Sequence, residues 1–308
     1  MSVPAGFLGV VLIWATTPLA IKWSSEGAGF LLGVAARMVL GVIVCLVLVA
    51  LLSRRMRWHR EALLTYLAAG IGLWGAMTSV YWSAQFIPSG LISELFGLSP
   101  VVTGVMAAIW LGERMLTPFR LLGLGLGLAG LSVVCAHGLR TGAGTTLGIA
   151  GVVLSVHIHA ASAVWIKRIG AGVPALETTT GALLIAVPLF VLNWAVLDGQ
   201  LPSALAPRAT WSIVYLAVFG SALGFILYFH VLRHVEASRV ALITLVTPVI
   251  ALVLGHEANG ETIGPRELAG TAVILTGLAC YQGGIAGSGV APDLCGEQGG
   301  RGVVGPLR

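Results

Sequence analysis

The sequence predicts an all-α integral membrane protein of about ten transmembrane helices, and three observations support this fold class. Hydrophobic residues make up 57% of the 308 residues and charged residues only 9%, with a mean hydropathy of +0.97. A soluble domain carries roughly 25% charged residues, because charge covers its surface. Long, continuous apolar stretches recur along the chain, each close to the roughly 20 residues that a membrane-spanning helix needs. A transmembrane β-barrel would instead show short alternating strands, so it is rejected.

The apolar stretches define the expected helices in chain order. They fall at about 4–22, 28–52, 62–85, 88–111, 117–136, 146–166, 176–197, 210–232, 239–257 and 266–285. The first stretch has no basic region and no small-residue cleavage site, so we expect a permanent helix and not a signal peptide. Residues 286–308 form a Gly-rich tail with nothing to bury, and we expect this tail to be disordered.

Lys and Arg in the connections predict the orientation of these helices. If the N terminus is cytoplasmic, twelve basic residues lie inside: Arg54, Arg55, Arg57, Arg60, Arg114, Arg120, Lys167, Arg168, Arg233, Arg239, Arg301 and Arg308. Four then lie outside: Lys22, Arg140, Arg208 and Arg266. Because cytoplasmic loops carry the excess of Lys and Arg, we expect a protein of the inner (plasma) membrane with both termini and the tail in the cytoplasm. The same residues account for the pI near 9.3, so no nucleic-acid partner is expected.

An internal repeat divides the chain into two halves. Ser99-Pro100 is followed by Glu113 thirteen residues after the proline, and Thr247-Pro248 is followed by Glu261 at the same spacing. Five helices separate the two copies, an odd number, so the second copy enters the membrane in the opposite sense. Inverted repeats of this kind build many secondary transporters, in which the substrate site lies near the membrane midplane between the halves. We therefore expect two inverted five-helix repeats.

The stretch from Trp14 to Lys22, the pair Ala36-Arg37 and the two repeated motifs together resemble the drug/metabolite transporter superfamily, specifically proteins with two EamA-type domains. The resemblance covers about residues 5–285. It implies EamA-type halves at 4–136 and 146–285, a central cavity between them, and the export of metabolites, amino acids or drugs.

The related small multidrug resistance proteins use a membrane glutamate in their first helix for proton coupling. Aligning Lys22 with the lysine that follows this helix places Trp14 near the position of the glutamate. Aligning Lys167 with Lys22 then places His159 at the corresponding position of the second half. The usual acid is absent here, so the resemblance leaves the coupling ion open.

Ionisable side chains inside the expected helices are costly to bury, so each is a candidate for the transport pathway. Arg37 and Glu94 lie at similar depths from the same side, roughly 9–12 Å at 1.5 Å per residue, so they can pair. Such a pair either fixes the packing or takes part in transport.

His157 and His159 lie near the middle of the sixth expected helix. They are about 200° apart on the helix, so they cannot bind one metal ion from the same side. His159 shares its face with Ser155 and Ser162, so we expect it, more than His157, to carry a proton or contact the substrate. For each histidine the alternative is a ring that is hydrogen-bonded within the bundle.

Prolines and glycines predict where the helices bend and touch. Pro18, Pro100 and Pro248 each free a carbonyl inside a helix, and we expect them to act as hinges. Small residues repeat on the fifth and tenth helices: Gly123, Gly127, Gly270, Gly277 and Gly284. They predict close helix contact, either within the chain or in a homodimer.

Enzyme signatures are missing from the sequence. The aspartates, Asp198 and Asp293, lie outside the expected helices, so no intramembrane aspartyl pair can form. No Walker-type nucleotide loop, cofactor motif or metal-ligand spacing is present. We therefore expect a secondary transporter, coupled to protons or another ion, that exports small molecules. The alternatives are a lipid-handling or flippase-like member of the same architecture, and a non-transporting membrane scaffold or sensor.

Overall fold

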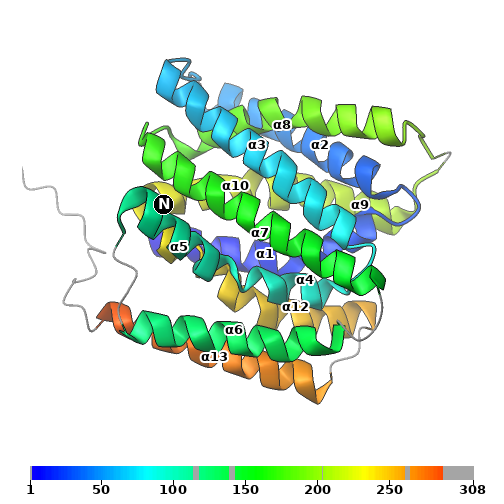
Figure 1. The fold of residues 1–308 in the computed structure, drawn as a ribbon. Helices are drawn as coiled ribbons and strands as arrows, with labels where there is room; N and C mark the ends of the chain where they lie inside the picture. Colours follow the sequence, from blue (N-terminus) through cyan, green and yellow to red (C-terminus); the bar gives the residue numbers. More distant parts are fainter. Residues whose placement is uncertain (1, 114–117, 139–142, 203, 261–263, 287–308) are drawn as a thin grey trace, which may run out of the picture.

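The computed structural model describes residues 2–113, 118–138, 143–202, 204–260 and 264–286 (Figure 1). The described residues form helices joined by short connections, and no strand occurs among them. The predicted all-α fold is therefore confirmed. The tail expected to be disordered lies outside the described residues, except for Ala286 at the end of the last helix.

The first half of the chain forms α1 (Val3–Ser24), α2 (Phe30–Leu51), α3 (Arg60–Ser83), α4 (Ser89–Phe96), α5 (Ser99–Leu111) and α6 (Pro118–Gly138). The second half forms α7 (Ala143–Ile169), α8 (Ala175–Leu197), α9 (Pro207–Tyr215), the π-helix η1 (Leu216–Leu223), α10 (Gly224–His234), α11 (Ala237–Val240), α12 (Ile243–Asn259) and α13 (Pro265–Ala286). Helices α9, η1 and α10 follow one another without a break.

Seven helical segments are long and apolar enough to cross a membrane: Val3–Ser24, Phe30–Leu51, Arg60–Ser83, Ser89–Leu111, Gly144–Ile169, Ala175–Leu197 and Pro207–His234. The chain is therefore a multi-pass membrane protein. The other three expected spans correspond to α6, α12 and α13. Of these, α6 and α13 contain shorter apolar stretches, Leu121–Gly130 and Leu268–Gly277.

Helix α1 lies in the interior of the bundle, where it contacts α4, α9, α10 and α12 (Figure 1). Helix α3 packs against both α7 and α8, and α2 packs against α8 and η1. Side chains of α1 such as Val10, Ala15 and Leu19 are buried against these helices, whereas Leu8 and Leu12 are exposed. A central helix of this kind can contribute side chains to an internal cavity.

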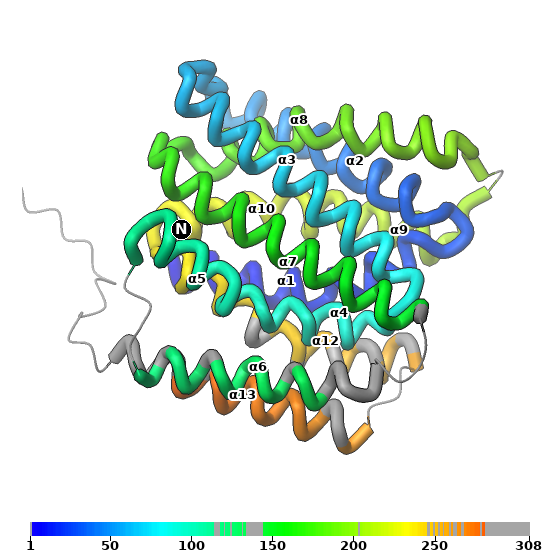
Figure 2. Tube along the Cα trace, in the orientation of Figure 1, coloured from blue at the N-terminus to red at the C-terminus, as the bar shows by residue number. Residues whose placement is uncertain are grey.

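Helices α6 and α13 lie side by side at one edge of the bundle (Figures 1 and 2). Their contact is built on glycines. A Cβ at Gly277 would lie 2.6 Å from the carbonyl oxygen of Gly123 and 2.8 Å from the amide nitrogen of Gly127. A Cβ at Gly130 would lie 2.6 Å from the carbonyl oxygen of Gly270. The small residues therefore form a contact within the chain, one of the two alternatives that the sequence left open, and no homodimer is needed to explain them.

The three prolines differ in their local structure. Helix α1 continues through Pro18. The expected helix at 88–111 is interrupted after Phe96, and Pro100 lies in the first turn of α5. Pro248 lies inside α12, which is separated from the short α11 by a turn. Their action as hinges stays a prediction.

Candidate functional site

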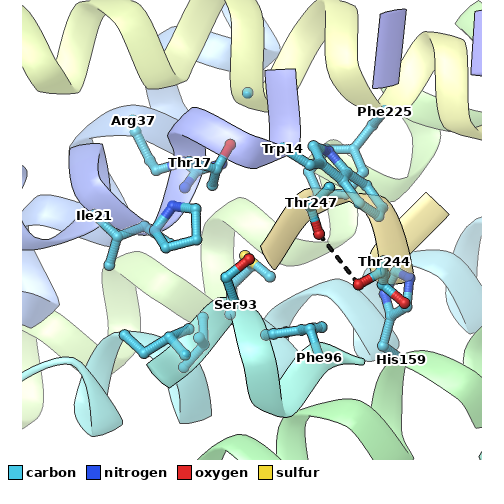
Figure 3. A pocket seen from close by; sticks show the side chains of 15 residues that line it. Trp14, Thr17, Ile21, Arg37, Ser93, Phe96, His159, Phe225, Thr244 and Thr247 are labelled. Carbon is cyan, nitrogen blue, oxygen red and sulfur yellow. Dashed lines mark hydrogen bonds between the residues drawn. The ribbon is translucent and has the colours of Figure 1, made fainter. Parts of the chain in front are cut away.

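The interior of the bundle holds a cavity of about 70 Å³ whose walls come from both halves of the chain (Figure 3). Helices α1, α2, α3 and α4 line it from the first half, and α7, η1, α10 and α12 line it from the second. Its polar side chains among the described lining residues include Thr17, Arg37, Ser93, His159 and Thr247. This volume is small for a metabolite, so the cavity must widen before it can hold one.

Arg37 on α2 is buried, with 1% of its surface exposed. Its Nε donates a hydrogen bond to Oγ of Ser221 at 3.0 Å, and its Nη1 donates to the hydroxyl of Tyr81 at 3.4 Å. The guanidinium carbon also lies 5.7 Å from the centroid of the Tyr81 ring, a cation–π distance. Two neutral hydroxyls therefore hold this buried cation in place at the cavity wall.

Glycines allow α2 and η1 to come close enough for these bonds. A Cβ at Gly41 of α2 would lie 2.9 Å from Cβ of Ser221. A Cβ at Gly220 of η1 would lie 3.1 Å from Nη2 of Arg37. Segments of π-helix occur frequently at functional sites, and here the π-helix carries the residue that binds Nε.

Glu94 on α4 is also buried, with 1% of its surface exposed. Ion pairs of the described residues include Arg57–Glu177, Arg208–Glu26 and Arg239–Glu236, and the pair of Arg37 with Glu94 stays a prediction. The burial of both side chains agrees with the depth predicted for them along their helices. Of the two neighbouring residues Ser93 and Glu94 on α4, it is Ser93 that lines the cavity.

Four aromatic rings meet beside the cavity. Trp14 stacks on Tyr228, with ring centroids 5.1 Å apart, and contacts Phe225 edge-on at 6.1 Å. His159 approaches Trp14 edge-on at 5.7 Å and Tyr228 at 5.2 Å. Trp14 and His159, the two residues that the alignment of the halves placed at corresponding positions, are thus in direct contact.

The two histidines of α7 face in different directions. His157 is exposed, and its Nδ1 lies 2.8 Å from the carbonyl oxygen of Val153 on its own helix. His159 lines the cavity. The structure therefore brings His159 together with Trp14 and Arg37 around one cavity, whereas His157 lies on the outer surface of the bundle.

The serines on the His159 face do not have the environment that the sequence suggested. Oγ of Ser155 donates to the carbonyl oxygen of Ala76 at 2.8 Å, and Oγ of Ser162 donates to the carbonyl oxygen of Ala68 at 2.9 Å. Both acceptors are on α3. The expected polar stripe for substrate or water is therefore a packing contact between α7 and α3, because small residues with a hydroxyl allow close helix approach and bond the facing backbone.

Several residues of the site were missed by sequence reasoning: Tyr81, Ser93, Ser221, Phe225, Tyr228, Thr244 and Thr247. Gly220-Ser221 did offer a signal, since a small polar residue in the middle of a long apolar run is unusual. The aromatic residues offered none, because such residues are common in membrane helices without a role at a site. Among the described residues, no group of three or more His, Cys, Asp or Glu side chains could hold a metal ion.

A multi-pass helical bundle around a central cavity has the architecture of a membrane transporter. The chain belongs to the EamA-like transporter family, which matches residues 3–136 and 146–281.

Named relatives agree with this assignment. The chain is 30% identical over 208 residues to the uncharacterized transporter YvbV of Bacillus subtilis, in an alignment that covers 63% of each protein. It is 28% identical to a probable terminal-alkyne amino-acid exporter of Streptantibioticus cattleyicolor, over 87% of this chain and 89% of the relative. It is 26% identical to a probable amino-acid metabolite efflux pump of Salmonella typhimurium, over 90% and 94%.

A solved crystal structure has the same fold. It superposes with a TM-score of 0.71 at 20% sequence identity, and the match covers 91% of this chain and 97% of the other. At this identity the likeness describes the fold alone.

Proposed function

We propose that this protein is a secondary transporter of the inner (plasma) membrane that exports small metabolites, with both termini in the cytoplasm. The observation that carries the proposal is a cavity lined by helices from both EamA-type halves. A cavity at the junction of two halves can be opened to either side by rocking one half against the other. Relatives named as an amino-acid exporter and an amino-acid metabolite efflux pump support export as the direction.

Helix boundaries support the proposed arrangement of ten helices in two inverted repeats. Helices α4 and α11 begin at Ser89 and Ala237, which are 148 residues apart. Helices α5 and α12 end at Leu111 and Asn259, which are also 148 residues apart. The prolines of the two repeated motifs have the same separation. We count α4 and α5 together as one membrane crossing in the first half. In the second half we count α9, η1 and α10 as one crossing, and α11 and α12 as another. Each half then contributes five crossings.

The contact between Trp14 and His159 supports a cavity at the interface of these halves. The two residues are counterparts 145 positions apart. Residues related by a two-fold axis can touch only where they lie close to that axis. Because their rings are 5.7 Å apart, the proposed pseudo-two-fold axis passes near the cavity wall.

Transport into inverted membrane vesicles tests the proposal. Vesicles that contain the protein, energised with an inside-acidic pH gradient, should accumulate at least one compound of a metabolite panel above the level of vesicles without it. A proton ionophore should abolish the accumulation if protons are the coupling ion. Absence of uptake for the whole panel under proton and sodium gradients would sink the proposal. Flipping of a fluorescent phospholipid in the same vesicles would instead favour the lipid-handling alternative.

A further inference from the structure

Arg37 gives the cavity a fixed positive charge. Among the described residues that line the cavity, Arg37 is the single residue of the types Lys, Arg, Asp and Glu. Its hydrogen-bond partners are the hydroxyls of Ser221 and Tyr81 and not a carboxylate. A cation buried in a low-dielectric site is costly, and such residues inside membrane helices mark ligand or ion pathways.

Part of the guanidinium is available to a ligand. The hydrogen bonds of Arg37 with the described residues use Nε and Nη1, whereas Nη2 forms none. Nη2 faces Gly220, where even a Cβ would come within 3.1 Å. Gly220 also lines the cavity, and without a side chain it lets Nη2 lie against the backbone of η1.

The two ends of the cavity differ in chemistry. Arg37 and Thr17 lie together at one end with Ile21, whereas the aromatic Trp14 and Phe225 lie toward the other, on the same side as Thr244, Thr247 and His159 (Figure 3). Phe96 also lines the cavity from α4. A ligand that fits both ends carries a negative charge at one end and an apolar body at the other.

We propose that the cavity takes a carboxylate with an apolar body, bound through its carboxylate by Arg37 and through its body by Trp14, Phe96 and Phe225. This rests on the proposed transport function and specifies its substrate class. Nη2 of Arg37 can donate a charge-assisted hydrogen bond to a carboxylate, which is stronger than its bond to a neutral amide and which a cationic amine cannot accept. Since the cavity is only about 70 Å³, binding requires the surrounding helices to separate while Ser221 and Tyr81 hold Arg37 in place.

Matched acid and amide pairs test the inference on the wild-type protein in detergent. The pairs are 3-phenylpropionate with 3-phenylpropanamide, indole-3-acetate with indole-3-acetamide, and hexanoate with hexanamide, and binding is measured by tryptophan fluorescence and thermal shift. Each acid that binds should do so roughly ten- to hundredfold more tightly than its amide, the range expected for hydrogen bonds to a charged group. Equal affinity for the two members of a pair, or binding by none of the acids, would overturn the inference.

Variants locate the effect at Arg37. Arg37→Met should remove the acid preference, whereas Arg168→Met should keep it. Arg168 is a matched control, because its guanidinium also lies over an aromatic ring, 6.0 Å from Trp165, but on the exposed surface. If Arg37→Met does not fold, Ser221→Ala and Tyr81→Phe each remove one anchor and should weaken acid binding while leaving amide binding unchanged. Unaltered acid binding in all the variants that fold would contradict the inference.

The outcomes also separate this inference from the transport function itself. Vesicle uptake of neutral or cationic compounds, with no preference for acids, would contradict the carboxylate site and still support the proposed transport function. Tight binding of acids without vesicle uptake of any acid would support the carboxylate site and contradict the proposed transport function.

Discussion

Buried and exposed arginines of this chain have different environments. Arg208 forms a two-point ion pair with Glu26, with bonds of 2.8 and 2.9 Å, but both side chains are partly exposed, so the pair contributes little to stability. Arg37 has no such carboxylate among its hydrogen-bond partners and is almost fully buried. Its two hydroxyl partners therefore matter more, because a buried charged donor that loses its partner has no water to replace it.

We predict that Ser221→Ala destabilises the protein by about 1–3 kcal/mol, because Nε of Arg37 loses its acceptor in a buried site. The measurement is the free energy of unfolding in detergent. Ser132→Ala is the control, since the hydroxyl of Ser132 bonds the carbonyl of Leu128 on an exposed helix face. Equal effects of the two substitutions would contradict the role assigned to Ser221.

We predict that His159→Gln flattens the pH dependence of vesicle uptake and that His157→Gln leaves it unchanged. An imidazole has an ordinary pKa of about 6.5, so it changes charge between pH 5 and 8. His159 lines the cavity beside Trp14 and Tyr228, with Arg37 at the other end, whereas His157 bonds its own helix on the surface. Uptake is measured from pH 5.5 to 8 at constant protein level. An unchanged profile in His159→Gln would place proton coupling at another residue.

Individual contacts were harder to predict from the sequence than burial. Periodicity and depth along the helix correctly predicted that Arg37 and Glu94 are buried. The alignment of the halves placed Trp14 and His159 at corresponding positions. The partners of Arg37 could not be predicted, since Ser221 is 184 residues away and its position depends on how η1 is rotated. The serines of α7 were misread for the same reason, because a polar stripe looks alike whether it faces a cavity or the backbone of α3.

The boundaries of the regular helices agree closely with the apolar stretches of the sequence. The expected helix at 28–52 is observed at Phe30–Leu51, and the one at 176–197 at Ala175–Leu197. The pattern did not predict the interruption between α4 and α5 or the π-helix within 207–234. A π-helix adds about one residue to a turn without changing the composition, so apolar periodicity carries no clear sign of it.

The glycine contact between α6 and α13 can be tested by substitution. Gly277→Ala should destabilise the protein by about 1–3 kcal/mol, because the added methyl group meets the backbone of α6, which cannot move aside as a side chain can. Gly125→Ala on α6 is the matched control, since no atom lies within 4 Å of its Cβ position. Alanine favours a helix over glycine, so this control should be neutral or stabilising. Destabilisation by both substitutions alike would contradict the contact.

The whole molecule has a basic end that fixes its predicted orientation. A single cysteine at Arg57, between α2 and α3, should react with a membrane-impermeant thiol reagent in inverted vesicles and not in intact cells. A cysteine at Gly199, between α8 and α9, should react in cells and not in inverted vesicles. The native cysteines are replaced by serine beforehand. Labelling of both positions from one side would contradict the orientation and the crossing number together.

Two polar contacts join the proposed halves at opposite ends of the molecule. Glu113, after α5, accepts hydrogen bonds from the amide of Ala237 at 3.3 Å and from the hydroxyl of Ser238 at 2.8 Å, both on α11. Glu26, after α1, is paired with Arg208 on α9. Both contacts are formed in the same structure, in which the cavity is small. Exchange between inward-open and outward-open states requires each contact to break in turn.

We predict that breaking the two contacts shifts access to the cavity in opposite directions. Glu113→Ala should raise the labelling of a cysteine at Thr17 by an impermeant reagent from the cytoplasmic side, because it releases the contact between α5 and α11. Arg208→Met should raise labelling of the same cysteine from the outer side. The exposed pair of Arg208 with Glu26 is worth about 1 kcal/mol or less, so its loss should change the rate a few-fold. The contact of Glu113 is part-buried, so its loss should have the larger effect.

The labelling is compared in inverted vesicles and intact cells, with Arg168→Met as a surface variant that should change neither rate. A double variant of Glu113 and Arg208 should restore the balance between the two sides, because it destabilises the closed state at both ends at once. An increase from one side in both single variants would mean that these contacts do not act at opposite ends. Since each contact joins one proposed half to the other, that result would also count against alternating access by movement between the halves.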